Sequence, residues 1–203
     1  MKELEFEARQ VISKEDYQRI MNFYSIEKFP NHKITSQKNY YFDNDKLEIT
    51  STGSVLRLRV FIKPLKKSEF TFKVATSKDK GDEEFTQHLS AEEEINLVEK
   101  HILPNGEVIE SLKSAKINLT KINYVGSIQT ERFEVYEKGY TIVIDANKYS
   151  GVEDFNIEIE STSKELANKK LSEILNAFNI PFMPGGPSKS SRAIKEYLKR
   201  KEN

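Results

Sequence analysis

The sequence predicts an α+β fold in which a closed antiparallel β-barrel, or tunnel, has helices packed on its outside. Alternation of polar and apolar residues recurs in many short segments, as in strands with two different faces. Amphipathic segments with capping residues interrupt these strands. Several strands also carry charged residues on the face opposite their apolar side chains. These three observations together favour a sheet whose apolar face is covered by helices.

The expected strands follow one another along most of the chain. They cover residues 3–10, 36–43, 54–62, 69–76, 82–89, 122–136, 139–147 and 153–160. Gly126 either breaks the segment 122–136 or introduces a bulge, so that this stretch is one strand or two. The sequence EKGY at 137–140 is a tight connection in which Gly139 suits a positive φ, so we expect a hairpin over 129–147.

Helices are expected between and after the strands. Ser13 with Asp16 and Ser90 with Glu93 fit N-terminal caps, and Thr162 with Glu165 fits a capping box. The helix over 163–178 has one apolar face, as a helix packed on a core should. Further helices are expected near 91–101, 105–116 and 190–201, the last of them basic.

Composition narrows the class of protein. The chain has 203 residues, which favours a single domain over 1–203. Charged residues make up 32% and sum to a net charge of zero, so we expect no nucleic-acid or membrane partner. There is no cysteine, no apolar run of membrane-spanning length and no apolar signal region at the N-terminus, so a cytoplasmic location is expected. The oligomeric state stays open, with a homodimer as one candidate.

The charges on the strands segregate by sign. The first and last strands carry acid pairs, whereas the strands around Arg57, Arg59 and Lys73 carry bases. A solvated face of an antiparallel sheet is the simplest explanation for charges on any one strand. Solvated faces usually mix the two signs, however, because like charges close together on a sheet destabilise it. We therefore favour charged faces that look inward, with the helices covering the apolar faces.

A channel lined by both acids and bases needs a ligand that carries both signs. Clustered carboxylates suit a hard cation such as Mg²⁺ or Mn²⁺. Clustered arginine and lysine suit phosphate oxygens, which arginine can bind with two parallel hydrogen bonds. A metal-bound polyphosphate satisfies both sets.

An ordered set of motifs resembles the CYTH superfamily, also called the triphosphate tunnel metalloenzymes. ELEFEAR at 3–9 is similar to the family's ExExK motif, and NYYFD, LRLR, FTFK and TERF follow it. The segments DANKYSGVEDFNIEIE at 145–160 and PSKSSRA at 187–193 resemble the family's acidic strand and C-terminal basic segment. The resemblance runs over nearly the whole chain and implies an eight-stranded antiparallel tunnel.

The resemblance also implies roles for individual residues. The expected metal ligands are Glu5, Glu7, Asp145, Glu158 and Glu160. The expected triphosphate-binding residues are Arg9, Tyr41, Arg57, Arg59, Lys73, Arg132, Lys189 and, as second choice to Lys189, Arg192. Glu5, Glu7, Arg9, Glu158 and Glu160 form the expected catalytic set.

Arg9 is a departure from the family motif, which has lysine there. Arginine keeps the charge but does not deprotonate, so a role in which the lysine donates a proton is in doubt. A second register would use Glu3 and Glu5 as the acids and put Glu7 in the lysine position. We prefer the Arg9 register because it retains the cation.

The expected activity is divalent-metal-dependent hydrolysis of inorganic triphosphate or a small organic triphosphate. The alternatives are an adenylate cyclase of the same family and a non-catalytic protein that binds polyphosphate or nucleotide. A barrel that carries apolar ligands would need its apolar strand faces inside, which conflicts with covering them by helices.

Overall fold

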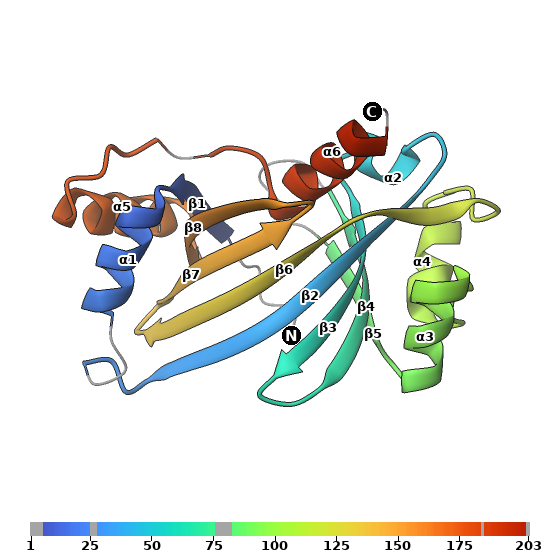
Figure 1. Ribbon diagram of the computed structural model, residues 1–203, viewed down its shortest axis with the longest axis horizontal. Coiled ribbons are helices and arrows are strands. Elements are labelled where there is room, and N and C mark those ends of the chain that lie inside the picture. Colours follow the sequence, from blue (N-terminus) through green and yellow to red (C-terminus); the bar gives the residue numbers. More distant parts are fainter. Residues whose placement is uncertain (1–5, 25–27, 76–82, 184, 202–203) are drawn as a thin grey trace. The chain divides into compact units, whose positions relative to one another are not determined.

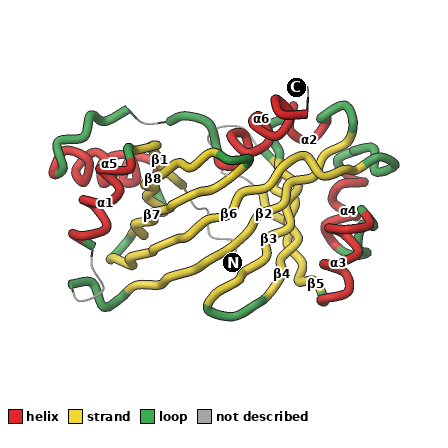
Figure 2. The backbone as a smooth tube through the Cα atoms, in the orientation of Figure 1, coloured by secondary structure: helices red, strands yellow, loops and turns green. Residues whose placement is uncertain are grey.

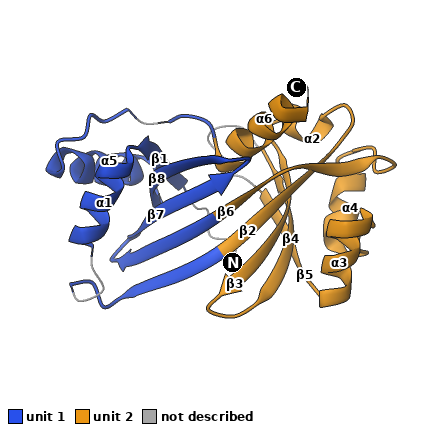
Figure 3. Ribbon diagram, viewed as in Figure 1, with its two compact units in different colours: residues 1–36, 130–187 blue, residues 37–129, 188–203 orange. Residues whose placement is uncertain are grey.

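The computed structural model describes residues 6–24, 28–75, 83–183 and 185–201. The chain forms two compact units, shown in different colours in Figure 3. Unit 1 comprises residues 1–36 and 130–187, and unit 2 comprises residues 37–129 and 188–203. The predicted glutamate Glu5 lies outside the described residues. The prediction of a single domain stays a prediction.

The strands form one sheet in the order β1-β8-β7-β6-β2-β3-β4-β5 (Figures 1 and 2). Their bounds are β1 Phe6–Ile12, β2 His32–Asn44, β3 Val55–Lys63, β4 Lys67–Val74, β5 Glu83–Leu89, β6 Ile122–Glu137, β7 Tyr140–Tyr149 and β8 Val152–Ser161. The ladders β1·β8, β7·β8, β3·β4 and β4·β5 are antiparallel. The predicted strands are therefore confirmed within a few residues where the chain is described, and 122–136 is one strand. Residues 3–5, 76 and 82 of the predicted strands lie outside the described residues.

The sheet has two edge strands among the described residues, β1 and β5. Hydrogen bonds in this part of the chain do not close it into a ring. The α+β class and the eight strands are confirmed, whereas closure into a barrel is not.

Helices account for most of the remaining described residues. Their bounds are α1 Lys14–Phe23, α2 Glu48–Ser51, α3 Ala91–Lys100, α4 Glu107–Ser114, α5 Lys164–Ala177 and α6 Lys189–Lys201. Ser13 caps α1, and Ser90 and Glu93 form the predicted cap of α3 as a full capping box. The prediction for α5 was wrong by one residue, because Ser163 rather than Thr162 accepts the hydrogen bond from the N–H of Leu166. None of the described helices is long and apolar enough to cross a bilayer.

In unit 1, helices cover one face of the sheet. α5 packs on β1 and β8, and α1 packs on β8 (Figure 1). The buried apolar cluster joins alternate strand residues such as Ile157 and Ile159 to helix residues such as Leu171 and Leu175. Glu158, which lies between Ile157 and Ile159, therefore points to the opposite face.

Unit 2 is built in the same way. α4 packs on β4 and β5, and α3 packs on β5. Leu56 and Leu58 of β3 are fully buried in a cluster with Leu97 of α3 and Leu112 of α4. Arg57 and Arg59 alternate with these leucines and so belong to the face that the helices leave uncovered. Each unit thus confirms, for its own strands, that helices take the apolar faces.

Candidate functional site

Strands β1 and β8 bring the acids of unit 1 together on one face. In their antiparallel ladder, Glu7 lies opposite Glu160 and Arg9 lies opposite Glu158. Asp145 of β7 lies opposite Asn156, two residues from Glu158 on the same face of β8. The spacing of two residues in NIEIE thus places the predicted acids side by side.

Arg132 of β6 lies among these carboxylates. Its Nε donates to Oδ1 of Asp145 at 2.9 Å and its Nη2 donates to Oδ2 of Asp145 at 3.0 Å. The same Nη2 is 3.4 Å from Oε2 of Glu158. Nη1 lies farther from its partners, at 3.8 Å from Oε1 of Glu160 and 4.0 Å from Oε1 of Glu134. One guanidinium therefore faces four carboxylates, and its fork to Asp145 has the shortest distances.

This ion-pair group is largely removed from water. The side chain of Asp145 is 0% exposed and that of Glu158 is 4% exposed, compared with 12% for Arg132. Burial alone would lower the pKa of Arg132, but the charge and hydrogen bonds of Asp145, with the charges of Glu158 and Glu160, raise it. The guanidinium is therefore held firmly in its charged form.

A buried network of asparagine side chains is hydrogen-bonded to this ion-pair group. Asn156 Nδ2 donates to Oδ2 of Asp145 at 3.3 Å, and its Oδ1 accepts from Nδ2 of Asn147 at 2.7 Å. Asn147 also accepts from the hydroxyl of Thr130 and donates to Asp154. Sequence reasoning did not single out either asparagine, although both alternate with the buried isoleucines as the acids do.

Glu7 and Arg9 form an ion pair with each other at the start of β1. Their side chains are 37% and 25% exposed, so they are more open to solvent than Asp145 and Glu158. Arg9 is thus on the same face as Glu158 and donates its hydrogen bond to Glu7.

Tyr41 of β2 is a buried hydroxyl of unit 2 on which the charges of four cations act. Tyr41 is 3% exposed. Burial raises the pKa of its hydroxyl, and the positive charges of Arg57, Arg59, Lys189 and Arg192 oppose that rise without cancelling it. Cations from β3 and α6, two segments far apart in the sequence, thus act through their charge on the same buried hydroxyl.

Hydrogen bonds hold part of this group and leave part of it unsatisfied. Arg59 Nε donates to Oδ1 of the buried Asn39 at 2.9 Å. Nε of Arg57 and Nε2 of Gln37 are buried and have no hydrogen-bond partner among the described residues. Buried donors without partners are rare and costly in proteins, so these two call for an explanation such as a ligand or water.

Gly126 lets α6 approach β6 closely. Its φ is 141°, and a Cβ atom there would lie 3.0 Å from the carbonyl oxygen of Ala193 and 3.3 Å from Cβ of Tyr197. Ala193 is fully buried, and Lys189 and Arg192 lie on the same helix. The glycine expected to disturb β6 instead provides the space against which the basic helix packs.

Acids also lie beside the bases of unit 2. Glu84 of β5 lies opposite Lys73, and its Oε1 is 3.4 Å from Nζ of Lys73. Its other oxygen is 4.0 Å from Nη2 of Arg57. Glu69 lies opposite Arg59 in the β3·β4 ladder. Lys73 and Arg57 are therefore partly neutralised by Glu84.

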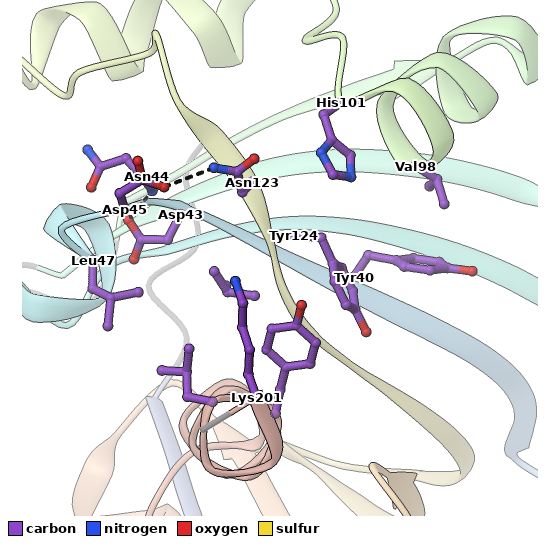
Figure 4. A pocket seen from close by; sticks show the side chains of 13 residues that line it. Tyr40, Asp43, Asn44, Asp45, Leu47, Val98, His101, Asn123, Tyr124 and Lys201 are labelled. Atoms are coloured by element: carbon purple, nitrogen blue, oxygen red, sulfur yellow. Dashed lines mark hydrogen bonds between the residues drawn. The ribbon is translucent and has the colours of Figure 1, made fainter. Parts of the chain in front are cut away.

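Unit 2 also contains a pocket of about 600 Å³, shown in Figure 4. Its aromatic wall consists of Tyr40, Tyr124 and Tyr197, with ring centroids 6.4 Å apart for the first pair and 5.0 Å for the second. Tyr40 and Tyr124 pack on the apolar cluster under α3 and α4. The predicted site residues do not line this pocket.

The donor chemistry of the acidic group suits a hard divalent cation, which binds carboxylate oxygens. However, no set of three or more acidic or histidine side chains in the described part of the chain is gathered so that it could hold a metal ion. Arg132 lies among the carboxylates that such an ion would use. Carboxylates are the kind of ligand that Mg²⁺ or Mn²⁺ binds, but these four are arranged around the guanidinium of Arg132.

Comparison with protein families gives a match to the CYTH domain over residues 3–193. The chain belongs to the CYTH family. The match includes both the acidic strands β1 and β8 and the basic residues Arg57, Arg59 and Arg192. The resemblance inferred from the sequence motifs is thereby confirmed.

Three known proteins are similar to this chain over most of its length. YjbK of Bacillus subtilis (strain 168), which carries a provisional name as a triphosphatase, is 28% identical over 179 residues, 88% of each chain. A crystal structure from Bacillus halodurans, provisionally named an adenylate cyclase, is 29% identical with a TM-score of 0.80, covering 94% of this chain and 97% of that one. A protein from Hippeastrum shares the fold at 20% identity, with a TM-score of 0.74 over 93% of both chains.

Proposed function

We propose that this CYTH domain is a metal-dependent triphosphatase that hydrolyses inorganic triphosphate or a small organic triphosphate. One observation carries the proposal: the face of each unit that is left uncovered by helices holds a charged group. In unit 1 four carboxylates lie around Arg132, and in unit 2 Arg57 and Arg59 lie on the uncovered face of β3. A metal–triphosphate complex has the chemistry that both groups would bind.

The cations of unit 2 would bind the phosphate oxygens. Arg57 brings a buried Nε donor without a partner among the described residues, so a phosphate oxygen would satisfy it. Arg59, Lys73, Lys189 and Arg192 would add positive charge for the non-bridging oxygens. Because Tyr41 keeps its proton, its hydroxyl could donate a hydrogen bond to the same ligand.

The carboxylates of unit 1 would supply the metal ligands, with Glu158 and Glu160 as the main pair and Glu7 beside them. When bound, Mg²⁺ or Mn²⁺ would supply charge neutralisation and polarisation of phosphate oxygens. A carboxylate of this group would orient the attacking water for in-line displacement at the terminal phosphorus. Arg9 would balance the charge of Glu7, with which it pairs, rather than act as a proton donor.

The relatives support this activity and one alternative. The related YjbK carries a triphosphatase name, and the Hippeastrum protein, provisionally named an adenylyl cyclase, is reported to have a dominant triphosphatase activity. The 29% identical relative from Bacillus halodurans carries a cyclase name, which makes adenylate cyclase the second candidate. Both reactions need phosphate-binding cations and metal-binding acids, so these residues alone do not separate them.

Product analysis separates the candidates. The chain should be incubated with inorganic triphosphate, thiamine triphosphate and ATP, each with Mg²⁺ or Mn²⁺. Release of orthophosphate from one or more of these supports the triphosphatase. Cyclic AMP with pyrophosphate from ATP would identify a cyclase, and binding without turnover of any of them would identify a non-catalytic protein.

A further inference from the structure

Gln37 of β2 is a buried glutamine whose side-chain donor is unsatisfied. The residue is 1% exposed, and its Nε2 has no hydrogen-bond partner among the described residues. A buried amide normally bonds to protein or to ordered water, because a buried donor without a partner is costly. The side chain of Gln37 therefore calls for an acceptor from outside the described part of the chain.

Strand alternation places Gln37 on the face of β2 that the helices leave uncovered. Phe42 of the same strand belongs to the apolar cluster under α3 and α4, and Tyr40 packs on that cluster. The odd-numbered residues of β2 therefore point the other way. Asn39 confirms this direction, because its Oδ1 accepts from Nε of Arg59 at 2.9 Å. Gln37 thus shares the face on which the arginines of β3 lie.

The neighbouring strand presents a second unsatisfied donor on this face. β3 lies beside β2 in the sheet, and Nε of Arg57 is buried without a hydrogen-bond partner among the described residues. Arg57 and Arg59 alternate with the leucines that the helices cover. Two buried N–H donors and two guanidinium charges therefore occur on one face of adjacent strands. An anionic oxygen is the acceptor that suits such donors best.

Resting on the proposed function, we propose that Gln37 is a further triphosphate-binding residue, whose side-chain N–H donates to a phosphate oxygen of the ligand bound by the arginines of β3. The amide carries no charge, so it adds a directed donor without adding repulsion among the cations of unit 2. Because this donor is already removed from water in the free protein, it loses no hydration when phosphate binds. Binding gains a hydrogen bond to a charged acceptor at little desolvation cost.

Replacing Gln37 should move stability and affinity in opposite directions. Gln37→Met keeps an unbranched side chain and removes the donor. The urea midpoint of the ligand-free protein should rise by about 0.5 M, because an unsatisfied buried donor is lost. The affinity for inorganic triphosphate should fall by about ten-fold or more. Isothermal titration in EDTA measures this affinity without metal-dependent turnover.

Gln87 of β5 provides a matched control in the same unit. Its Nε2 donates to the carbonyl oxygen of Asn105 at 2.8 Å, and its Oε1 accepts from the N–H of Val108 at 3.1 Å. Gln87→Met removes a satisfied glutamine, so it should lower the urea midpoint and leave the triphosphate affinity unchanged. The opposite signs of the two midpoint shifts separate an unsatisfied amide from a structural one.

Three results would overturn the proposal. The first is an unchanged triphosphate affinity in Gln37→Met, whatever its stability. The second is a fall in affinity together with a lower urea midpoint, because a structural amide bonded to buried water explains that combination. The third is a wild type that does not bind triphosphate. If Gln37→Met does not fold, Gln37→Ala removes the same donor, and the same ten-fold loss of affinity is expected relative to Gln87→Ala.

Titration in EDTA measures binding alone, so it is independent of the triphosphatase activity. If Gln37→Met weakens triphosphate binding but the wild type hydrolyses no triphosphate with Mg²⁺, the proposed function is refuted and the role of Gln37 stands. If the wild type hydrolyses triphosphate but Gln37→Met binds it as tightly as the wild type does, only the role of Gln37 is refuted.

Discussion

Glu7 and Glu160 lie directly opposite each other in the ladder between β1 and β8. Like charges in this position destabilise a sheet, typically by about 0.2–1 kcal/mol. Arg9 neutralises Glu7, and Arg132 lies 3.8 Å from Glu160. Two facing acids do not stabilise the sheet by themselves, whereas the proposed metal binding would use both of them.

The Glu160→Gln variant should therefore be more stable than the wild type when no metal is present. We expect its free energy of unfolding to rise by about 0.5 kcal/mol, because the facing charges are removed while the shape is kept. Metal-dependent triphosphate hydrolysis should fall in the same variant. Urea unfolding in EDTA and phosphate release with Mg²⁺ measure the two effects. A variant that is less stable and fully active would indicate a structural role instead.

The Arg57→Ala variant tests the basic group of unit 2. Loss of hydrogen bonds from a charged donor should raise KM for triphosphate by about ten-fold or more. Steady-state kinetics with Mg²⁺ at saturating concentration give this value. Lys113→Ala serves as a control, because Lys113 pairs with Glu110 on the exposed face of α4. Unchanged kinetics in Arg57→Ala would remove this residue from the site.

Gly126→Ala should weaken the packing of α6 on β6. The added Cβ would lie 3.0 Å from the carbonyl oxygen of Ala193 at a φ of 141°, so we expect a loss of about 1–3 kcal/mol in the free energy of unfolding. Gly139→Ala is a matched control, since Gly139 also has a positive φ but has no atom within 4 Å of the added carbon. Urea unfolding compares the two. An equal loss in both would show that backbone strain, rather than the close approach of α6, is the cause.

Tyr24 should make the stability of the chain depend on alkaline pH. Burial is the main cause that raises its pKa from 10.0 to about 12. Its contribution is therefore complete below pH 10, where the unfolded tyrosine also keeps its proton, and is lost as the pH rises toward 12. Between pH 10 and pH 12, the free energy of unfolding of the Tyr24→Phe variant should fall by about 2 kcal/mol less than that of the wild type. Parallel loss in both proteins would contradict this assignment.

The strands and their faces could be predicted from the sequence because period-two alternation directly determines which side chains share a face. Leu56 and Leu58 went to the helix-covered side and Arg57 and Arg59 to the other, as expected. Ser13 and Ser90 were also found, because a hydroxyl followed three residues later by an acid is a specific capping signal.

Features that depend on ladder register or on distant segments could not be predicted. The short helix α2 begins after Leu47. The carboxylate that accepts hydrogen bonds from the N–H groups of Ile49 and Thr50 belongs to Asp43 of the preceding strand β2, not to a residue of the helix. The ion pair between Lys73 and Glu84, whose side chain is 42% exposed, depends in the same way on the register of β4 and β5. The partners of Arg132 likewise depend on how β6 and β7 are aligned.

The central claim is that the ionic faces of the strands bind a metal–triphosphate complex and hydrolyse it. Phosphorus NMR of inorganic triphosphate incubated with the chain tests this claim directly, once with Mg²⁺ and once with EDTA. We predict that the triphosphate resonances convert to those of orthophosphate and pyrophosphate only when Mg²⁺ is present. Unchanged triphosphate resonances under both conditions, with a folded protein, would contradict the claim.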